Sequence, residues 1–412
     1  MCKLRRVICG VVLGAVVVDC ATAHTGSHGM RHSLPDTVAR TWMREHAPET
    51  RDWNWRDGVL VYGLWRMHER TREPTYADYV RDYMAHHLAT GISVRWSDHT
   101  TPALTAAELV LAGEARFRPL VDRVVRYIMQ APRTAQQGLI RHTADRVPSW
   151  LLPGWLPDIW VDSLFHIVPT LMRYSEITRS PRYAGEAVQQ LQGFARNLQD
   201  PETHLFTHAY NDWPRNQPVP SFDRRAFWAR GNGWILVTLV DVLSRLPQNH
   251  PVRPELSQRL ARQVKALLRV QSSEGLFHTL LLDPASYLET AGSALIAYGL
   301  AEGARHGLLD AEAQVAAEHA MRGLQSIVTR QGDRALVTGT SLGTNPIAFR
   351  YRRIRRRSQV SYGVGAWLMA ASTPAWDRAM TGSLPRQGAG ATSPLRAKRG
   401  AAQHAATYAN EP

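Results

Sequence analysis

Two aspartates stand where helices are expected to begin, and their type and spacing suit acid–base chemistry. Asp162 follows an aromatic residue in "WVDSLFH" (residues 160–166), and Asp98 precedes a proline in "WSDHTTP". A free aspartate has a pKa of about 3.9, so a proton-donating role requires apolar walls or a second carboxylate that raise it. Trp160 and Trp228 could supply the walls, and Asp98 the second carboxylate. The alternative is that both aspartates only cap their helices.

The stretch "FWARGNGW" (residues 227–234) places a cation and aromatic rings at the start of a long apolar helix. The N-terminus of a helix offers free N–H groups and a positive dipole end, which favour an anion. Arg230 could hold a carboxylate through two parallel hydrogen bonds, while Trp228 and Trp234 could stack on a sugar ring. The glycines would let the backbone approach a ligand. This pattern favours a site for an acidic sugar; the alternative is a tight helix entry with both tryptophans in the core.

Histidines occur both in connections and inside expected helices. His208, in "HLFTHAYND", lies in a connection, where a polar ring is more often solvated or ligand-binding than buried. We therefore predict that it contacts the substrate. His142, in "LIRHTAD", is a similar candidate with less support from the sequence. His68 and His166 fall within expected helices and are predicted to be structural.

The chain is basic, with 412 residues, 49 Lys and Arg, 35 Asp and Glu, and a net charge of +14. A basic protein favours an anionic ligand. No zinc-finger, RNA-recognition or basic-zipper pattern accompanies the charge, so nucleic acid is not an expected partner. The basic run "RYRRIRRR" (residues 350–357) is predicted to be a solvated face, although it could instead attract an anionic oligosaccharide.

The first 23 residues are expected to be a signal peptide. "MCKLRR" is a basic start, "VICGVVLGAVVV" is a short apolar core, and "ATA" (residues 21–23) suits cleavage before His24. A lipoprotein signal at Cys20 is a weaker alternative. The three cysteines all precede the expected cleavage point, which excludes disulfides and cysteine chemistry from the mature chain. We expect a bacterial periplasmic or secreted protein with no membrane contact after cleavage.

The remaining periodicity is helical and predicts an all-α fold. Six times, an apolar helix is followed by a turn and a more polar, amphipathic segment. The apolar helices are expected to start near Trp53, Asp98, Asp158, Arg230, Glu289 and Val360. Apolar helices require burial on most faces and amphipathic ones on a single stripe. Six such hairpins predict an (α/α)6 barrel, in which an outer ring of helices surrounds an inner one.

This barrel is expected to form one domain that spans residues 24–376. Inner helices that run in the same direction place all their N-terminal residues on one rim, where the aspartates and aromatic residues described above would meet. Residues 377–412 are rich in Gly, Ala, Pro and Arg without periodicity, and we expect them to be a disordered basic tail.

In order along the chain, several motifs resemble glycoside hydrolase family 105, the unsaturated rhamnogalacturonyl hydrolases. The motifs are "WVDSLF", "HAY", "WARGNGW", "ETAGSA" and "YGVGAWLMA", and the opening "WNWRDGVLVYGLWRMHERTREPTY" matches as well. The resemblance extends from about Trp53 to Ser372. It implies an (α/α)6 barrel, in agreement with the hairpins counted above.

The resemblance also implies a reaction, the removal of a 4,5-unsaturated uronic acid from the non-reducing end of lyase-generated oligosaccharides. In this family an Asp protonates C4 of the double bond, water adds at C5, and the resulting hemiketal opens and expels the aglycone. By resemblance, Asp162 is that Asp and Asp98 contacts sugar hydroxyls. Four further residues match sugar- or carboxylate-binding positions, namely His208, Trp228, Arg230 and Trp234, and Trp160 would line the same site. The resemblance implies no metal or organic cofactor, and we expect a monomer.

Two segments depart from the family pattern, so the aglycone is less well defined than the unsaturated sugar. The segment "TADRVPSWLLPGWLP" (residues 143–157) is longer and more aromatic than usual, and residues 339–357 also depart from the pattern late in the chain. One alternative is an unsaturated glucuronyl hydrolase acting on ulvan, gellan or glycosaminoglycan fragments. A second is an inactive carbohydrate-binding relative. A sugar epimerase would need a pair of acid–base histidines on facing helices, and no such pair is evident at helix starts.

Overall fold

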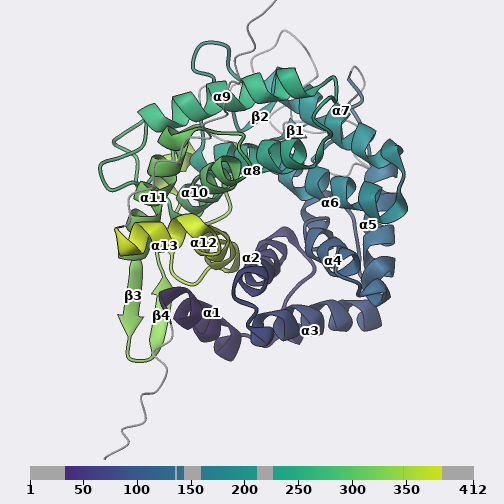
Figure 1. Cartoon of the computed structure of the whole chain (residues 1–412), viewed down its shortest axis with the longest axis horizontal. Coiled ribbons are helices and arrows are strands. Elements are labelled where there is room, and N and C mark those ends of the chain that lie inside the picture. The colour runs from purple at the N-terminus through teal and green to yellow at the C-terminus, as the bar shows by residue number, and fades with distance from the viewer. Residues whose placement is uncertain (1–32, 135–136, 143–158, 211–225, 347, 383–412) are drawn as a thin grey trace, which may run out of the picture. The chain divides into compact units, whose positions relative to one another are not determined.

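The apolar helices predicted from the sequence form a closed inner ring in the computed structural model (Figure 1). The structure describes residues 33–134, 137–142, 159–210, 226–346 and 348–382. Each inner helix packs against the next, and the last packs against the first. The inner helices are α2 (Trp55–Thr71), α4 (Pro102–Leu111), α6 (Asp162–Thr178), α8 (Ala229–Arg245), α10 (Thr290–Arg305) and α12 (Ser361–Ala371).

A second ring of helices covers the first from outside (Figure 1). Five outer helices follow their inner partners along the chain: α3 (Pro74–Thr90), α5 (Arg118–Gln130), α7 (Pro181–Leu198), α9 (Arg253–Arg269) and α11 (Ala311–Ser326). Helix α12 is covered instead by α1 (Leu34–Glu45) and α13 (Pro374–Thr381). The predicted (α/α)6 barrel is therefore confirmed.

Burial separates the two rings as the sequence predicts. Every residue of α10 from Thr290 to Gly303 is buried, because neighbouring helices surround it. The outer helix α5 buries a single stripe, which comprises Leu120, Val121, Val124, Val125 and Ile128. Spacing of three and four residues keeps such side chains on one face of a helix. Proline in the first turn of α3, α5, α7 and α9 helps to start the outer helices, since the N–H that it lacks has no partner there.

Short strands fix the connections at the N-terminal ends of the inner helices. β1 (Ile159–Trp160) pairs with β2 (Ala209–Tyr210), β3 (Val328–Gln331) with β4 (Arg334–Val337), and β5 (Thr340–Ser341) with β6 (Arg356–Arg357). Four 3-10 helices complete the described elements: η1 (Pro48–Thr50), η2 (Ser97–His99), η3 (Ala115–Phe117) and η4 (Ala348–Arg353).

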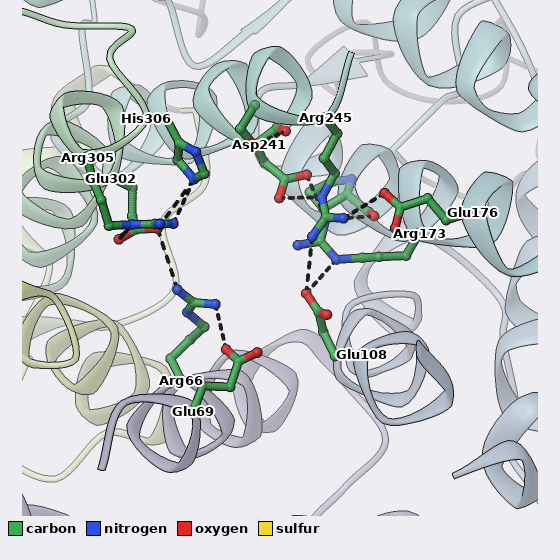
Figure 2. Close-up of polar contacts among 12 residues, drawn as sticks. Arg66, Glu69, Glu108, Arg173, Glu176, Asp241, Arg245, Glu302, Arg305 and His306 are labelled. Atoms are coloured by element: carbon green, nitrogen blue, oxygen red, sulfur yellow. Dashed lines mark hydrogen bonds and ion pairs between the residues drawn. The ribbon is translucent and has the colours of Figure 1, made fainter. Parts of the chain in front are cut away.

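The opposite end of the barrel is closed by ion pairs (Figure 2). The C-terminal carbonyl groups of the inner helices converge there, and such negative dipole ends favour cations. Arg173, which is 2% exposed, donates to Glu108 and to Asp241 at 2.7 Å each. Arg66 bonds Glu69 at 2.5 Å and lies 3.5 Å from Glu302. These paired charges leave a cavity of only about 250 Å³ at this end.

Two glycines form the seam where the last inner helix meets the first. A Cβ placed on Gly365 of α12 would lie 2.6 Å from the Cα of Leu60 and closer still to the carbonyl oxygen of Val59. A Cβ on Gly63 of α2 would collide with the backbone of Gly365. The ring therefore closes through direct backbone contact, which a side chain on either glycine would prevent.

We expect Gly365→Ala to destabilise the protein by about 3 kcal/mol, because the added methyl group has only backbone atoms to displace. Gly185→Ala is the matched control, since Gly185 lies in outer helix α7 with open space around its Cα. That change should stabilise the helix by about 0.5–1 kcal/mol. Chemical denaturation followed by circular dichroism measures both. Equal free energies of unfolding for the Gly365→Ala variant and the parent would show that the seam is not tight.

Two boundaries differ from the sequence predictions. Helix α1 was not anticipated, although Val38 and Trp42 show helical spacing and are buried. The expected tail begins too early, because α13 continues to Thr381; Asp377 pairs with Arg70 and so holds the helix on the barrel. The expected signal peptide, residues 1–23, lies outside the described residues, as do residues 383–412. None of the described helices is both long and apolar enough to span a membrane.

Candidate active site

Asp162 lies at the N-terminal end of the inner ring, as the first residue of α6. It makes no capping hydrogen bond, because the N-cap position belongs to Val161. The N–H of Val161 donates to the carbonyl of His208 at 2.9 Å, which continues the β1–β2 pairing and brings the two connections together. As a result, Nε2 of His208 lies 3.3 Å from Oδ2 of Asp162. Nδ1 of the same ring is 2.8 Å from the hydroxyl of Tyr351.

Asp98 reaches the same site from η2, and it does not cap a helix either. Its Oδ1 lies 3.6 Å from Nδ1 of His166 and 3.8 Å from Nε2 of His142. The Asp98 side chain is 27% exposed and that of Asp162 is 14% exposed, whereas all three histidine rings are buried. Asp98 thus keeps part of its side chain exposed and Asp162 a smaller part, with Oδ2 of Asp162 buried against His208.

His166 was predicted to be structural, and it is indeed buried, but it also lies beside Asp98. It lies one helical turn after Asp162 on α6, so the two side chains share a face. Neither of its ring nitrogens has a hydrogen-bond partner among the described residues, although the ring is buried next to Asp98. The i, i+4 spacing in "DSLFH" was the signal that could have identified it.

His142 lies beside the carboxyls, and its ring is held in place on two sides. Its Nδ1 lies 3.0 Å from Oγ of Ser97 and 2.9 Å from Oγ of Ser163. Its ring stacks on Trp160 with the centroids 4.3 Å apart and the planes 5° from parallel. Trp160, which is partly exposed, thus forms a wall of the site as predicted.

The two carboxyls differ in charge, in the opposite sense to the sequence prediction. Burial, followed by the negative charge of Asp162, raises the pKa of Asp98 from 3.8 to about 7. Burial alone would also raise the pKa of Asp162, but contact with His208, with smaller effects of His166 and His142, lowers it to about 2. The expected elevation of the Asp162 pKa is therefore wrong, because the sequence did not show that His208 faces this carboxyl.

Burial lowers the pKa of His142 to about 3 and that of His166 to about 4, so both rings are neutral near pH 7. Near pH 7 the site thus holds Asp98, which is protonated in about half of the molecules, beside the ionised Asp162. Two neighbouring carboxyls in different protonation states are the usual basis for acid–base chemistry at one site. Among the described residues, no group of His, Cys, Asp or Glu is placed to hold a metal ion.

Arg230 lies in the first turn of α8 and is 1% exposed. Its guanidinium donates to Oγ of Ser341 at 2.8 Å and to Oγ1 of Thr344 at 3.1 Å, and it lies 3.5 Å from Oε1 of Glu289. The guanidinium carbon lies 4.2 Å from the centroid of the Trp228 ring. In this structure Arg230 therefore anchors the segment 341–344 against the site.

The glycines of "FWARGNGW" are helical and do not form the flexible turn that was expected. Gly231 lets Val161 pack against α8, and Gly233 lets Leu295 of α10 do so. Between them, Asn232 donates to the carbonyl of Phe206 and accepts from its N–H, both at 2.8 Å. Asn232 thereby holds the connection that carries His208.

Two of the expected sugar platforms are buried. Trp234 is fully buried and stacks on Phe165, and Trp228 is 1% exposed beneath His208. Neither ring offers a free face, which supports the alternative that they belong to the core. Trp160 and Trp55, in contrast, keep part of their surface exposed.

The comparison that decides the family is a match of residues 27–374 to the model described as Glycosyl Hydrolase Family 88. The chain belongs to glycosyl hydrolase family 88. It is accordingly a glycoside hydrolase, as the sequence motifs predicted.

Two proteins that are similar in sequence to this chain are named for the unsaturated sugar group on which they act. The unsaturated rhamnogalacturonyl hydrolase YesR of Bacillus subtilis is 28% identical over 265 residues, which cover 64% of this chain and 73% of YesR. An unsaturated 3S-rhamnoglycuronyl hydrolase of Formosa agariphila is 29% identical over 220 residues, 52% of this chain and 56% of that protein. The predicted resemblance to the unsaturated rhamnogalacturonyl hydrolases is thus confirmed.

Solved structures of the family share the fold. A structure from Klebsiella pneumoniae, described as a possible member of family GH105, is 26% identical and covers 88% of this chain and 98% of its own, with a TM-score of 0.72. The unsaturated glucuronyl hydrolase of Bacillus sp. GL1 is 18% identical, covers 82% and 94%, and has a TM-score of 0.64.

Proposed function

We propose that this family 88 member releases a 4,5-unsaturated uronic acid from the non-reducing end of lyase-generated oligosaccharides, with unsaturated rhamnogalacturonides as substrates. The observation that carries this proposal is the pair of partly exposed carboxyls, Asp98 and Asp162, whose pKa values are shifted in opposite directions. The names of the relatives support the substrate class. The proposal requires no metal or organic cofactor.

In the proposed reaction Asp162 gives a proton to C4 of the double bond, and water then adds at C5. The hemiketal that results opens, and the C1–O bond to the aglycone breaks. Asp162 must carry a proton first, and the anionic uronate supplies a reason: its charge and the loss of water raise the pKa of a neighbouring carboxylate. His208, 3.3 Å away, can pass a proton to Asp162 and is in turn held by Tyr351. After the transfer, Asp162 is again a carboxylate that can accept a proton from water.

Asp98 and the aromatic walls complete the proposed site. Asp98, protonated up to about pH 7, can donate to a sugar hydroxyl while His166 and His142 orient it. Trp160 and Trp55 would face the sugar ring. Trp228 and Trp234 then act indirectly, since they support His208, Arg230 and His166 from the core.

Incubation of the protein with lyase-generated unsaturated rhamnogalacturonan oligosaccharides tests the proposal. The ultraviolet absorbance of the conjugated double bond should fall, and mass spectrometry should show an aglycone shorter by one uronic acid. An absorbance that stays constant, with intact oligosaccharide, would refute it.

A second candidate is hydrolysis of unsaturated glucuronyl fragments from ulvan, gellan or glycosaminoglycans, which the rhamnoglycuronyl relative favours. The same assay with those fragments ranks the substrates. An inactive binding relative would bind these oligosaccharides and leave the absorbance unchanged. A sugar epimerase is not favoured: of the three histidines near the carboxyls only His166 lies on a helix, and the chain belongs to a glycoside hydrolase family.

Arg230 is proposed to bind the uronate carboxylate, with help from its place at the start of α8. We expect Arg230→Lys to weaken substrate binding by about 1.5–3 kcal/mol, because lysine lacks the planar fork. Arg253→Lys is the matched control: Arg253 is also a buried arginine of the α8–α9 pair, and it donates to the carbonyls of Leu243 and Leu246 at the far end. Both variants should lose stability, and only Arg230→Lys should raise KM. If both variants had the same KM, the proposal that Arg230 binds the substrate would be wrong.

We also propose that the protein is exported after cleavage before His24 and acts as a monomer in the periplasm or outside the cell. The basic start and short apolar core of residues 1–23 support this proposal.

A further inference from the structure

The arginines of the basic run, residues 350–357, are exposed as predicted, but the run is also attached to the candidate active site. Tyr351 is 1% exposed and forms a small apolar cluster with Ala226 and Trp228. Its hydroxyl lies 2.8 Å from His208, the partner of Asp162. The start of the run is therefore held one side chain, that of His208, away from the proposed proton donor.

The run has a second attachment to the site, at its C-terminal end. Arg356 pairs with Ser341 and Arg357 with Thr340 in the β5–β6 ladder. Ser341 is the residue whose hydroxyl accepts from Arg230. The run thus lies along the edge of the site between two fixed points, Tyr351 and β6.

The arginines in between differ in how far they are paired. Arg352 bonds Asp283 at 2.6 Å, and Arg356 lies over the ring of Tyr287 at 4.9 Å. Arg353, Arg355 and Arg357 are exposed, and no carboxylate of the described chain lies within ion-pair distance of them. Successive side chains of an extended segment point to opposite faces, so Arg355 and Arg357 share the face that Arg356 does not occupy. These three residues are called the cationic edge below.

We propose that the cationic edge binds negative charge on the aglycone, so that the preferred substrate carries at least one further anionic group beyond the unsaturated uronate. This inference rests on the proposed function and adds a substrate class to it: acidic oligosaccharides in preference to an unsaturated uronate joined to a neutral sugar. Arg353 is two residues from Tyr351, so its Cα lies within about 7 Å of that anchor. Unpaired cations along an edge attract an anionic group and raise its local concentration.

The test compares two substrates that differ in aglycone charge. One is an unsaturated uronate linked to a single neutral rhamnose; the other is a longer fragment whose aglycone contains a second uronate. The triple variant Arg353→Gln, Arg355→Gln, Arg357→Gln removes the cationic edge. The matched control replaces Arg123, Arg126 and Arg262 with glutamine, since these are exposed arginines on the outer helices α5 and α9.

The measured quantity is the ratio of kcat/KM for the acidic aglycone to kcat/KM for the neutral one. We expect the triple variant to lower this ratio by about tenfold, on the scale of electrostatic attraction at low salt. The control variant should keep the ratio of the parent. In the parent the ratio should also fall as salt rises from about 0.01 M to about 1 M, because the screening length shrinks from about 30 Å to about 3 Å.

The outcomes separate the two proposals. A parent that turns over both substrates, with a ratio that neither the triple variant nor salt changes, would overturn the inference and leave the proposed function intact. Equal losses in the triple variant and the control would overturn it as well, because net charge alone would then explain the effect. No turnover of either substrate by the parent would overturn the proposed function itself.

Discussion

Asp162→Asn is expected to lower turnover of an unsaturated oligosaccharide by close to 10⁴-fold, the upper end of the range for a general acid–base group. The same side chain is assigned two steps, protonation of C4 and removal of a proton from water, and an amide can perform neither. Asparagine keeps the size of the side chain, so the fold and ligand binding should persist. Loss of the double-bond absorbance measures turnover, circular dichroism the fold, and calorimetry the binding.

Asp310→Asn is the matched control for this variant. Asp310 also stands at a helix start, but it caps α11 by accepting from the N–H of Ala313 at 3.1 Å. Asparagine caps helices as well as aspartate does, so turnover and stability should stay at the parental level. More than about a tenth of parental turnover in the Asp162→Asn variant would place the donor elsewhere. Asp98 would then be the first residue to test.

Asp98→Asn is expected to lower turnover by about 10²-fold, because it removes the carboxyl that holds a proton near neutral pH. In the parent, turnover should fall as pH rises through about 7, where Asp98 loses its proton. An asparagine has no such proton to lose, so the variant should lack that alkaline decline. A decline with the same midpoint in both proteins would assign it to a different group.

Stability gives a second readout for Asp98 that does not depend on catalysis. The pKa of Asp98 is raised in the folded state, from 3.8 to about 7, so the unfolded chain releases this proton at lower pH than the folded one. The contribution of protonated Asp98 to the free energy of unfolding is fully present below about pH 4 and is lost as the pH rises through about 7. The free energy of unfolding of Asp98→Asn should therefore exceed that of the parent at pH 8 by more than it does at pH 4. Urea denaturation at the two pH values measures this difference.

The helical ring was predictable because its signal is local. Six apolar helices recur along the chain, and burial on most faces, as in α10, needs no knowledge of the partner helix. Helix α1 was missed because it precedes the first hairpin and covers α12, which lies more than 300 residues further along the chain. A pattern of successive pairs cannot show that the first segment covers the last.

The carboxyls of the site were predictable, whereas their protonation was not. Asp98 and Asp162 stood out by type and by their place at helix starts. Which of them holds the proton depends on His208, which reaches Asp162 only through the β1–β2 pairing of distant segments. The role of Tyr351 was equally hidden, because its sequence neighbours are arginines and its partner is 143 residues away. Pairing between distant segments leaves no trace in local composition.

The glycine seam between α2 and α12 also determines the order of events when the chain is made. Gly63 and Gly365 touch across the seam but are separated by about 300 residues, and at synthesis rates of about 5–20 residues per second the second appears about 15–60 s after the first. During that interval the face of α2 that α12 will cover has no partner from this chain. The ring therefore cannot close until α12 has been synthesised, because α2 and α12 are the two helices that meet at the seam.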